Sequence, residues 1–475
     1  MSRTTVLVGG AVVTVDEARR VHDPGAVAIE GDRIAAVGPR EQVLTEHRDA
    51  ETIELQHAAI LPGLVDSHGH AGHALTKDVA DGTGEWLDAV AELYFRASGT
   101  SFWEAESRLA ALERLQAGVT TSLSYTGSMP RVDDPKFAEA AASGYEAYGL
   151  RHVVAVGPPN APLPRRCYDP ETGTETLVDL DRAMETTEAV VDDLHGSADG
   201  RLSVAVAPSS LVPELDDDGA ATAFSVEQLE RVVALAEDRD LSMQAHAYAG
   251  EVAAAAAAVP EVLSDRLSLA HCAGIDEREI EIMAENDVSA SHGPLTHAYA
   301  SARFPVVEAM EAGVNVAVST DGAAPDRSFD LLAQGRIAAQ LQRAHFGDTS
   351  LFPAGKVLET MTIDAAEALG LEDEVGSLEP GKRADVVAVD LDAAKLAPRV
   401  QHVPRLVNYA DGSDVEFVAV DGETLVADGE LQVDAAVDEV LADADRELRA
   451  AVERAGFESY LDPHPDLWGA VRYRR

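Results

Sequence analysis

Short apolar runs alternate along most of the chain with segments whose apolar residues recur at three-four spacing. The runs have the length of β-strands, and segments such as 102–116 and 226–239 have the pattern of amphipathic helices. Eight strands alternating with helices predict an α/β fold, a (β/α)₈ TIM-like barrel. An open doubly wound sheet would alternate in the same way, but no G-x-G-x-x-G motif follows any of the runs. The candidate strands are residues 59–66, 118–125, 151–157, 202–207, 241–246, 267–271, 287–292 and 314–319.

Both ends of the chain are rich in short β-segments separated by turn residues. Such segments occur at 4–15 and 26–37, and again at 384–389, 415–420 and 424–431. This pattern predicts a small β-sandwich built from both chain ends. We therefore expect four parts, which are sandwich residues 1–58, barrel residues 59–370, sandwich residues 371–434, and a C-terminal helix and tail at 435–475.

Two long segments interrupt the predicted barrel and one acidic segment follows it. Residues 71–101 and 158–181 are long for barrel loops, which predicts either a functional or a disordered role. Residues 253–258 are an alanine run that favours a barrel helix. Residues 435–455 have the pattern of an acidic amphipathic helix.

The charge balance limits the classes of partner. The chain has 84 Asp+Glu against 37 Lys+Arg, a formal net charge of −47, and the acidic residues are spread along its whole length. This charge repels phosphate backbones and anionic lipid, so we expect no nucleic-acid or membrane partner and a small-molecule substrate. A dispersed acidic surface poor in lysine also suits a protein kept in solution at high salt.

Cysteine usage and the lack of a long apolar run point to a cytoplasmic protein. The two cysteines, Cys167 and Cys272, rule out a disulfide scaffold, and we expect both to be chemically inert. No signal-peptide pattern opens the sequence, and no apolar run approaches 18 residues.

Histidines stand where the candidate strands end. His68 and His70 follow the first strand and share one face, which makes a half-site for a divalent metal. Alone, the pair is equally compatible with two histidines on a solvated turn. However, His246, His271 and His292 end the fifth, sixth and seventh strands. Asp321 follows the eighth strand. The carboxyl ends of barrel strands meet at one mouth, so we expect these side chains to converge there.

At these motifs the chain resembles the amidohydrolase superfamily, in its cytosine-deaminase-like and chlorohydrolase-like branch of guanine, S-adenosylhomocysteine and triazine aminohydrolases. The resemblance covers nearly the whole chain. It rests on the segments 62–70 (PGLVDSHGH), 118–121 (GVTT), His246, 271–272 (HC), 291–294 (SHGP), 313–322 (GVNVAVSTDG) and 375–385 (VGSLEPGKRAD).

The resemblance implies a ligand set and a reaction. His68, His70, His246 and Asp321 would bind one divalent metal, zinc or alternatively iron. His271 would stand beside the bound water, and Asp321 would also carry its proton. Such water attacks an amidine-like carbon of a nitrogen heterocycle, and ammonia or an alkylamine leaves. The resemblance also suggests a homodimer.

Two departures from the pattern bear on the reaction. No lysine occurs between Lys136 and Lys356, so no carboxylated lysine can bridge a second metal, which favours a mononuclear site. Ala249 stands where this branch usually has a glutamate that protonates a ring nitrogen. Either Glu251 takes over that role, or it is a solvated acid in the first turn of a helix. The missing glutamate leaves open the hydrolysis of a cyclic amide or a C–Cl bond. A catalytically dead scaffold is disfavoured by the complete ligand set.

The remaining candidates each have a functional and a structural interpretation. His73 is expected to line the mouth or orient a ligand, and His292 to contact substrate or support the site. Trp86 belongs to an aromatic group that forms either a lid over a flat heterocycle or packing beneath the loop. The other members of this group are Tyr94, Phe95, Phe102 and Trp103. Residues 294–297 read Pro-Leu-Thr-His where relatives often have Pro-x-Ser-Asn, so the substrate cannot be transferred from the resemblance.

Overall fold

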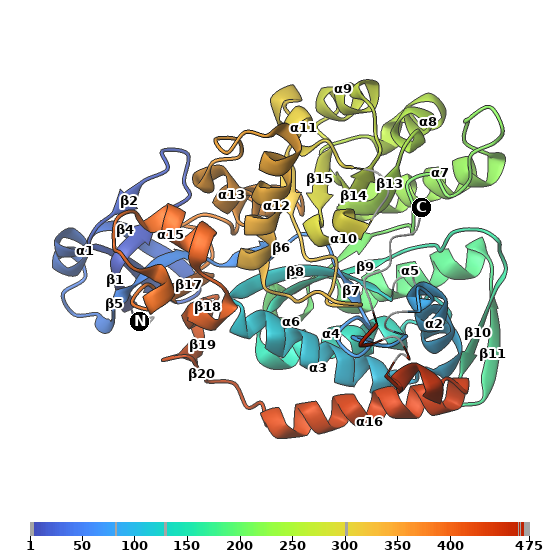
Figure 1. Cartoon of the computed structure of the whole chain (residues 1–475), viewed down its shortest axis with the longest axis horizontal. Coiled ribbons are helices and arrows are strands. Elements are labelled where there is room, and N and C mark those ends of the chain that lie inside the picture. Colours follow the sequence, from blue (N-terminus) through green and yellow to red (C-terminus); the bar gives the residue numbers. More distant parts are fainter. Residues whose placement is uncertain are drawn as a thin grey trace.

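The structure is a computed structural model that describes residues 4–80, 83–127, 131–299, 303–463, 465 and 467–469. Its central sheet is a nearly closed parallel barrel surrounded by helices, which confirms the predicted fold class (Figure 1). The sheet order is β16-β15-β14-β13-β12-β9-β8-β6, with β7 paired to β8. These strands are β6 Leu64–Asp66, β7 His70–Ala71, β8 Val119–Thr126, β9 Arg151–Val156, β12 Leu202–Val206, β13 Met243–Tyr248, β14 Leu267–Ala273, β15 Ser289–His292 and β16 Val316–Val318.

The prediction of one continuous strand over 59–66 is wrong. β5 (Glu51–Pro62) pairs with β1 (Thr4–Val13) and β17 (Val386–Asp390) in the terminal sheet, and β6 begins the barrel after Gly63. A Cβ atom on Gly63 would lie 2.0 Å from Oγ1 of Thr120, so only glycine fits at this crossing. The run of apolar residues is continuous in the sequence because the terminal sheet buries its first part and the barrel buries its last part.

Side-chain hydrogen bonds help to close the barrel between its first and last strands. Asp66 at the end of β6 accepts the backbone N–H of Thr320 at 2.8 Å and its hydroxyl at 2.7 Å. The backbone N–H of Asp321 donates to the carbonyl of His68 at 3.1 Å. The chain segments that carry His68 and Asp321 are therefore held directly against each other.

The second sheet is built from both ends of the chain, as predicted. β1 lies between β3 and β5, and β5 lies between β1 and β17, so the two halves meet at the β5–β17 pair. Figure 1 shows these blue and orange strands side by side. The other strands of this sheet are β2 Val21–His22, β3 Gly25–Glu30, β4 Arg33–Pro39, β18 Val415–Val420, β19 Glu423–Ala427 and β20 Glu430–Leu431.

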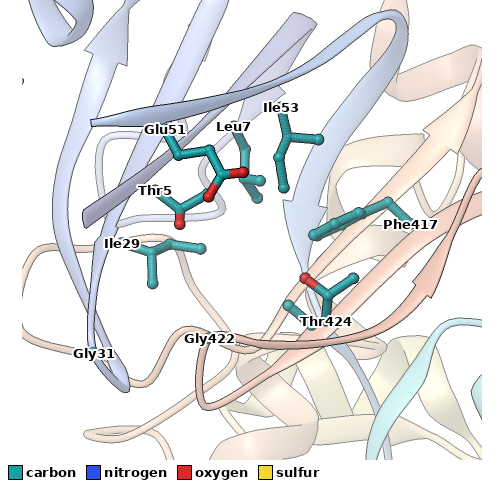
Figure 2. Close-up of a pocket in the computed structure, with 10 residues that line it drawn as sticks. Thr5, Leu7, Ile29, Gly31, Glu51, Ile53, Phe417, Gly422 and Thr424 are labelled. Atoms are coloured by element: carbon teal, nitrogen blue, oxygen red, sulfur yellow. The ribbon is translucent and has the colours of Figure 1, made fainter. Parts of the chain in front are cut away.

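The terminal sheet lines an open pocket of about 550 Å³ (Figure 2). Leu7, Ile53 and Phe417 form much of its apolar wall, and Glu51 and Thr424 add polar groups. None of the residues that line it belongs to the strand-end histidines. The pocket thus belongs to the sandwich and is separate from the barrel mouth.

Helices cover the barrel and flank the terminal sheet. The predicted helices at 102–116, 226–239 and 253–258 correspond to α3, α7 and α8. None of the helices among the described residues combines the length and apolar character needed to cross a lipid bilayer. The helices are α1 Arg40–Glu46, α2 Trp86–Glu92, α3 Thr100–Gln116, α4 Lys136–Tyr148, α5 Leu180–Leu194, α6 Ser197–Gly200, α7 Ala223–Arg239, α8 Glu251–Ala258, α9 Glu277–Glu285, α10 Pro294–Tyr299, α11 Val306–Ala312, α12 Leu331–Phe346, α13 Ala354–Thr360, α14 Ile363–Glu367, α15 His402–Tyr409 and α16 Val437–Ala455.

The two long segments contain regular structure rather than bare loop. The first holds α2 and a π-helical turn at Leu93–Ala97, and the second holds the hairpin of β10 (Arg165–Asp169) and β11 (Thr174–Val178). The predicted acidic helix is α16, which lies along α3 (Figure 1). Tyr94, Phe102 and Trp103 are fully buried in a cluster that also contains residues of α16. The packing interpretation therefore holds for these three aromatic residues.

Candidate metal centre at the barrel mouth

Three of the predicted histidines converge at the carboxyl ends of the barrel strands. His68 lies between β6 and β7, His70 lies in β7, and His246 lies in β13. Each is buried, and one ring nitrogen of each lies within 4.8 Å of the others. The Nε2 atoms of His70 and His246 are 3.3 Å apart.

The outer nitrogen of each ring faces a hydrogen-bond acceptor. His68 Nδ1 lies 2.8 Å from Oε1 of Gln244, His70 Nδ1 lies 2.9 Å from the carbonyl of Gly127, and His246 Nδ1 lies 2.5 Å from the carbonyl of Ser209. Gln244 is itself oriented by donating its amide to the carbonyl of Ser67 at 2.9 Å. Because an acceptor holds the proton on Nδ1, the lone pair of each ring is on Nε2 and faces the centre.

Asp321 supplies a carboxylate to the same centre. Its Oδ1 lies 3.3 Å from His68 Nε2 and 3.2 Å from His70 Nε2. Its Oδ2 accepts hydrogen bonds from Thr296 and, at 3.0 Å, from Arg327. Burial alone would raise the pKa of Asp321, but the positive charge of Arg327 and the neighbouring histidines hold that pKa well below its ordinary value. Asp321 is therefore ionised throughout the physiological range.

The backbone after β16 takes a strained path that directs Asp321 into the site. Asp321 has φ +55°, in the left-handed region, and Gly322 has φ +79°. A Cβ atom on Gly322 would lie 2.3 Å from Nδ1 of His73. The Asp-Gly sequence is thus required both by the turn and by the close approach of His73.

His271 completes the inner group. It ends the predicted sixth strand in β14 with φ +70°, and its ring centre is 5.2 Å from that of His246 and 5.4 Å from that of His68. With His68 and Asp321 it forms a second set of donor atoms within 4.8 Å of one another. Burial lowers the pKa of His271 to about 3, so the imidazole is neutral.

The arrangement fits a divalent metal ion. Two Nε2 lone pairs that face each other at 3.3 Å repel unless a cation lies between them. Nε2 of His68 is buried and has no hydrogen-bond partner among the described residues. Three imidazoles and one carboxylate are also the donor set of divalent first-row metals. The site therefore binds a divalent metal, and it contains the four predicted ligands with His271 beside them.

The segments after β9 and β12 offer no ligand for a second metal. β9 is followed by Gly157 and two prolines, and β12 is followed by residues 207–209, Ala-Pro-Ser. Neither segment carries a carboxylate, an imidazole or an amine. The mononuclear site that the lysine gap favours therefore stays a prediction.

The predicted substrate residues lie around this centre. The His73 ring stacks on His70 at 4.9 Å, and its other neighbour is the edge of Trp86 at 5.0 Å. The Trp86 indole donates to the carbonyl of Thr76 at 3.3 Å. His292 is 1% exposed, and neither of its ring nitrogens has a hydrogen-bond partner among the described residues. These positions suit substrate contacts, but a substrate role for them stays a prediction.

Glu251 is buried rather than solvated. It is the first residue of α8, and its carboxyl group accepts the backbone N–H of Val212 at 3.2 Å. Burial raises the pKa of Glu251 to about 8. Among the described residues, no hydrogen bond joins it to the histidine centre. Its catalytic role therefore stays a prediction.

Sequence reasoning missed three residues that hold the ligands in place. Gln244 lies two positions before His246 on the same face of β13, so strand alternation could have identified it. Thr296 lies in α10 after β15, and Arg327 lies in the segment after β16. No hydrophobic pattern in the sequence identifies Thr296 or Arg327. Only the fold brings them to Asp321.

Comparisons with known proteins agree with this geometry. The sequence profile described as "Amidohydrolase family" matches residues 59–425, and one described as "Imidazolonepropionase-like composite domain, bacteria" matches residues 25–50. A 5-methylthioadenosine/S-adenosylhomocysteine deaminase of Moorella thermoacetica is 31% identical over 429 residues, which cover 86% of this chain and 91% of the relative. A 5'-deoxyadenosine deaminase of Methanothermobacter thermautotrophicus is 31% identical over 426 residues, covering 86% of this chain and 91% of that protein.

Solved structures share the whole architecture. An adenosine deaminase from Xanthomonas campestris with bound zinc superposes with a TM-score of 0.80 at 26% identity, over 94% of this chain and 98% of that one. The atrazine chlorohydrolase TrzN from Arthrobacter aurescens TC1, complexed with zinc, gives a TM-score of 0.75 at 22% identity, over 94% and 100% of the two chains. The second likeness shows the fold alone. The chain belongs to the amidohydrolase family, and it is a metal-dependent aminohydrolase that acts on carbon–nitrogen bonds other than peptide bonds.

Proposed function

We propose that the protein is a zinc-dependent deaminase of adenine nucleosides, which replaces the amino group on the six-membered ring with oxygen and releases ammonia. The observation that carries the proposal is the convergence of ring nitrogens from His68, His70 and His246, with Oδ1 of Asp321 beside the Nε2 atoms of His68 and His70. The names of the relatives supply the substrate class, since they include deaminases of adenosine, 5'-deoxyadenosine and 5-methylthioadenosine.

The metal would supply Lewis acidity and lower the pKa of a water molecule. We propose that His68, His70, His246 and Asp321 hold it, with zinc preferred over iron because imidazole and carboxylate are its ordinary ligands. His271 is neutral, and its Nδ1 has no hydrogen-bond partner in the part of the chain that the structure describes, so it can hold the attacking water in place. Asp321 is ionised and can pass a proton from that water to the departing amine.

Further residues are proposed to act on the heterocycle. Burial keeps Glu251 protonated at neutral pH, which is the state that a proton donor to a ring nitrogen needs. Both ring nitrogens of His292 lack a partner among the residues that the structure describes, so they can bind polar atoms of the substrate. His73 and Trp86 present ring surfaces next to His70 that suit a flat base.

A substrate panel tests the proposal. The protein is purified in high salt, its zinc content is measured, and ammonia release is followed with adenosine, 5'-deoxyadenosine, 5'-methylthioadenosine and S-adenosylhomocysteine. We expect release from at least one of them, with loss of activity in His246→Ala. Silence across the panel from protein with one zinc per chain would overturn the proposal.

One observation favours a second candidate, the hydrolysis of a C–Cl bond or a cyclic amide at the same site. Ala249 carries no acid, and the carboxyl group of Glu251 is bonded to Val212 rather than to the histidine centre. A leaving group that needs no ring protonation could dispense with that acid. Chloride release from a chlorotriazine by Glu251→Gln at the wild-type rate would favour this candidate, whereas loss of ammonia release in Glu251→Gln would favour the deaminase.

We also propose that the enzyme works in the cytoplasm as a homodimer on a small-molecule substrate, with no nucleic-acid or membrane partner. The net charge of −47 supports the exclusion of polyanionic partners and suits a cytoplasm of high salt content. Sedimentation of the metal-loaded protein in high salt tests the dimer, and a monomer at micromolar concentration would contradict it.

A further inference from the structure

Arg327 is the single arginine or lysine, among the described residues, that contacts Asp321. Its Nη1 donates to Oδ2 of Asp321 at 3.0 Å, and its Nη2 donates to the carbonyl of Ala324. The Arg327 side chain is 5% exposed and that of Asp321 is 6% exposed, so this ion pair is shielded from water. Thr296 joins the two, because its hydroxyl accepts from Arg327 Nη1 at 2.5 Å and donates to Oδ2 of Asp321.

The carboxylate of Asp321 is thus divided between two sets of partners. Oδ1 faces the Nε2 atoms of His68 and His70, where a metal would be held, while Oδ2 faces Arg327 and Thr296. Among the described residues, Arg327 is the one arginine or lysine whose side chain pairs with this carboxylate. In the metal-free site, Arg327 therefore supplies the positive charge that balances Asp321.

We propose that Arg327 acts as a built-in counter-cation, which stabilises the metal-free site and, as a second cation on the same carboxylate, weakens the binding of the divalent metal. The two effects are linked thermodynamically. A group that stabilises the metal-free protein more than the loaded protein must lower metal affinity by the difference. Arg327 is then an affinity-setting residue that keeps the carboxylate ordered before the metal arrives.

Zinc affinity, measured by competition with a chromophoric chelator, tests whether the positive charge of Arg327 weakens zinc binding. Arg327→Met removes the cation and keeps an unbranched side chain, so we expect it to bind zinc about tenfold more tightly or better, since like charges repel strongly in a site of low permittivity. Arg327→Lys keeps the charge and should stay within about threefold of wild type, because one charge is exchanged for another at the same place. Arg303→Met is the control, because Arg303 pairs with Glu308 and, among the described residues, forms no hydrogen bond or ion pair with Asp321.

A second variant separates the effect of the Arg327 charge from the orientation of the Asp321 carboxylate. Thr296→Val removes the hydroxyl that donates to Oδ2 but leaves both charges in place. It should weaken zinc binding, the opposite sign to Arg327→Met, because the carboxylate loses an orienting hydrogen bond.

Thermal unfolding gives the complementary measurement. Arg327→Met should lower the unfolding temperature of the metal-free protein more than that of the zinc-loaded protein. If the metal-free variant does not fold, Arg327→Gln, whose amide can still donate to Oδ2, takes its place. Zinc affinity that is unchanged or weaker after removal of the charge would overturn the proposal, and so would equal destabilisation of the two forms. These measurements need no substrate, so they stand or fall separately from the deaminase activity.

Discussion

The Nε2 atoms of His70 and His246 lie 3.3 Å apart, although acceptors on the far side of each ring hold both protons on Nδ1. The acceptors are the backbone carbonyls of Gly127 and Ser209, which the ends of β8 and β12 fix in place. The barrel mouth therefore holds two lone pairs face to face. Their repulsion is relieved when a cation lies between them, so metal binding and stability are coupled.

Removal of the metal should destabilise the protein. A ligand that binds only the folded state adds about 4 kcal/mol to the free energy of unfolding when its free concentration is 1,000 times its Kd. We expect EDTA to lower the unfolding temperature measured by calorimetry and zinc to restore it. His246→Ala is the control, since its unfolding temperature should respond much less to either addition. Equal responses of the two proteins would contradict a metal held by His246.

Gln244 should control metal affinity without touching the metal. It accepts the Nδ1 proton of His68 and so keeps the lone pair on Nε2. Loss of such an outer partner lowers metal affinity about 10–100-fold. We expect this loss in Gln244→Leu, measured by chelator competition. Gln228→Leu on α7 is the matched control, because Gln228 is equally buried and its amide has no hydrogen-bond partner among the described residues. A similar loss in both variants would indicate a general packing defect.

The ligands were predictable from sequence because barrel strands place their carboxyl ends together. His68, His70, His246, His271 and Asp321 each follow an apolar run, and the structure brings them to one mouth. The break between β5 and β6 was not predictable, since two different sheets bury the same apolar stretch.

Other contacts depend on the tertiary fold alone. Thr296 and Arg327 stand in segments without periodicity, and no local pattern indicates that both reach Oδ2 of Asp321. The burial of Trp103 depends on α16, which starts more than 300 residues later in the chain. Sequence patterns therefore identified the residues at strand ends. The residues that hold these side chains in place could be identified only from the folded structure.

Among the residues that do not bind the metal, substitution of Asp66 should lower the free energy of unfolding the most. Its carboxylate pairs with Arg114 at 3.2 Å, and both side chains are at most 1% exposed. Asp66→Asn leaves the buried Arg114 charge without its ion-pair partner, which costs about 3–5 kcal/mol in comparable pairs. We expect a large fall in the denaturant midpoint. Asp443→Asn, which breaks a half-exposed pair with Arg108, should cost less than about 1 kcal/mol. Comparable shifts in the two variants would contradict the role of Asp66 in closing the barrel.

Salt should stabilise the folded protein. The net charge of −47 makes the folded surface repel itself, and raising the salt from about 0.1 M to about 1 M shortens the Debye length from ~10 Å to ~3 Å. We expect the unfolding temperature to rise steadily over this range of KCl, which has little effect on hydrophobic burial. An unfolding temperature that stays constant, or falls, would contradict adaptation of this surface to high salt.

Glu251 should make stability depend on pH with a defined sign. Burial raises the pKa of Glu251 from its ordinary 4.5 to about 8 in the folded protein. The folded state thus holds this proton more tightly than the unfolded state does. Its contribution is fully present below pH 4.5 and is lost as the pH rises to about 8, because over this range the unfolded state releases the proton while the folded state retains it.

Glu251→Gln removes this dependence, because a neutral amide of similar shape cannot ionise. We expect the free energy of unfolding of wild type to fall by a few kcal/mol relative to that of Glu251→Gln between about pH 5 and about pH 8, at 1.4 kcal/mol per unit of pKa shift. Denaturant titrations across this range measure the difference. Glu277→Gln, at an exposed position in α9, is the control and should follow wild type. Parallel pH curves for wild type and Glu251→Gln would show that Glu251 ionises normally, and would remove the basis for its proposed role as a proton donor at neutral pH.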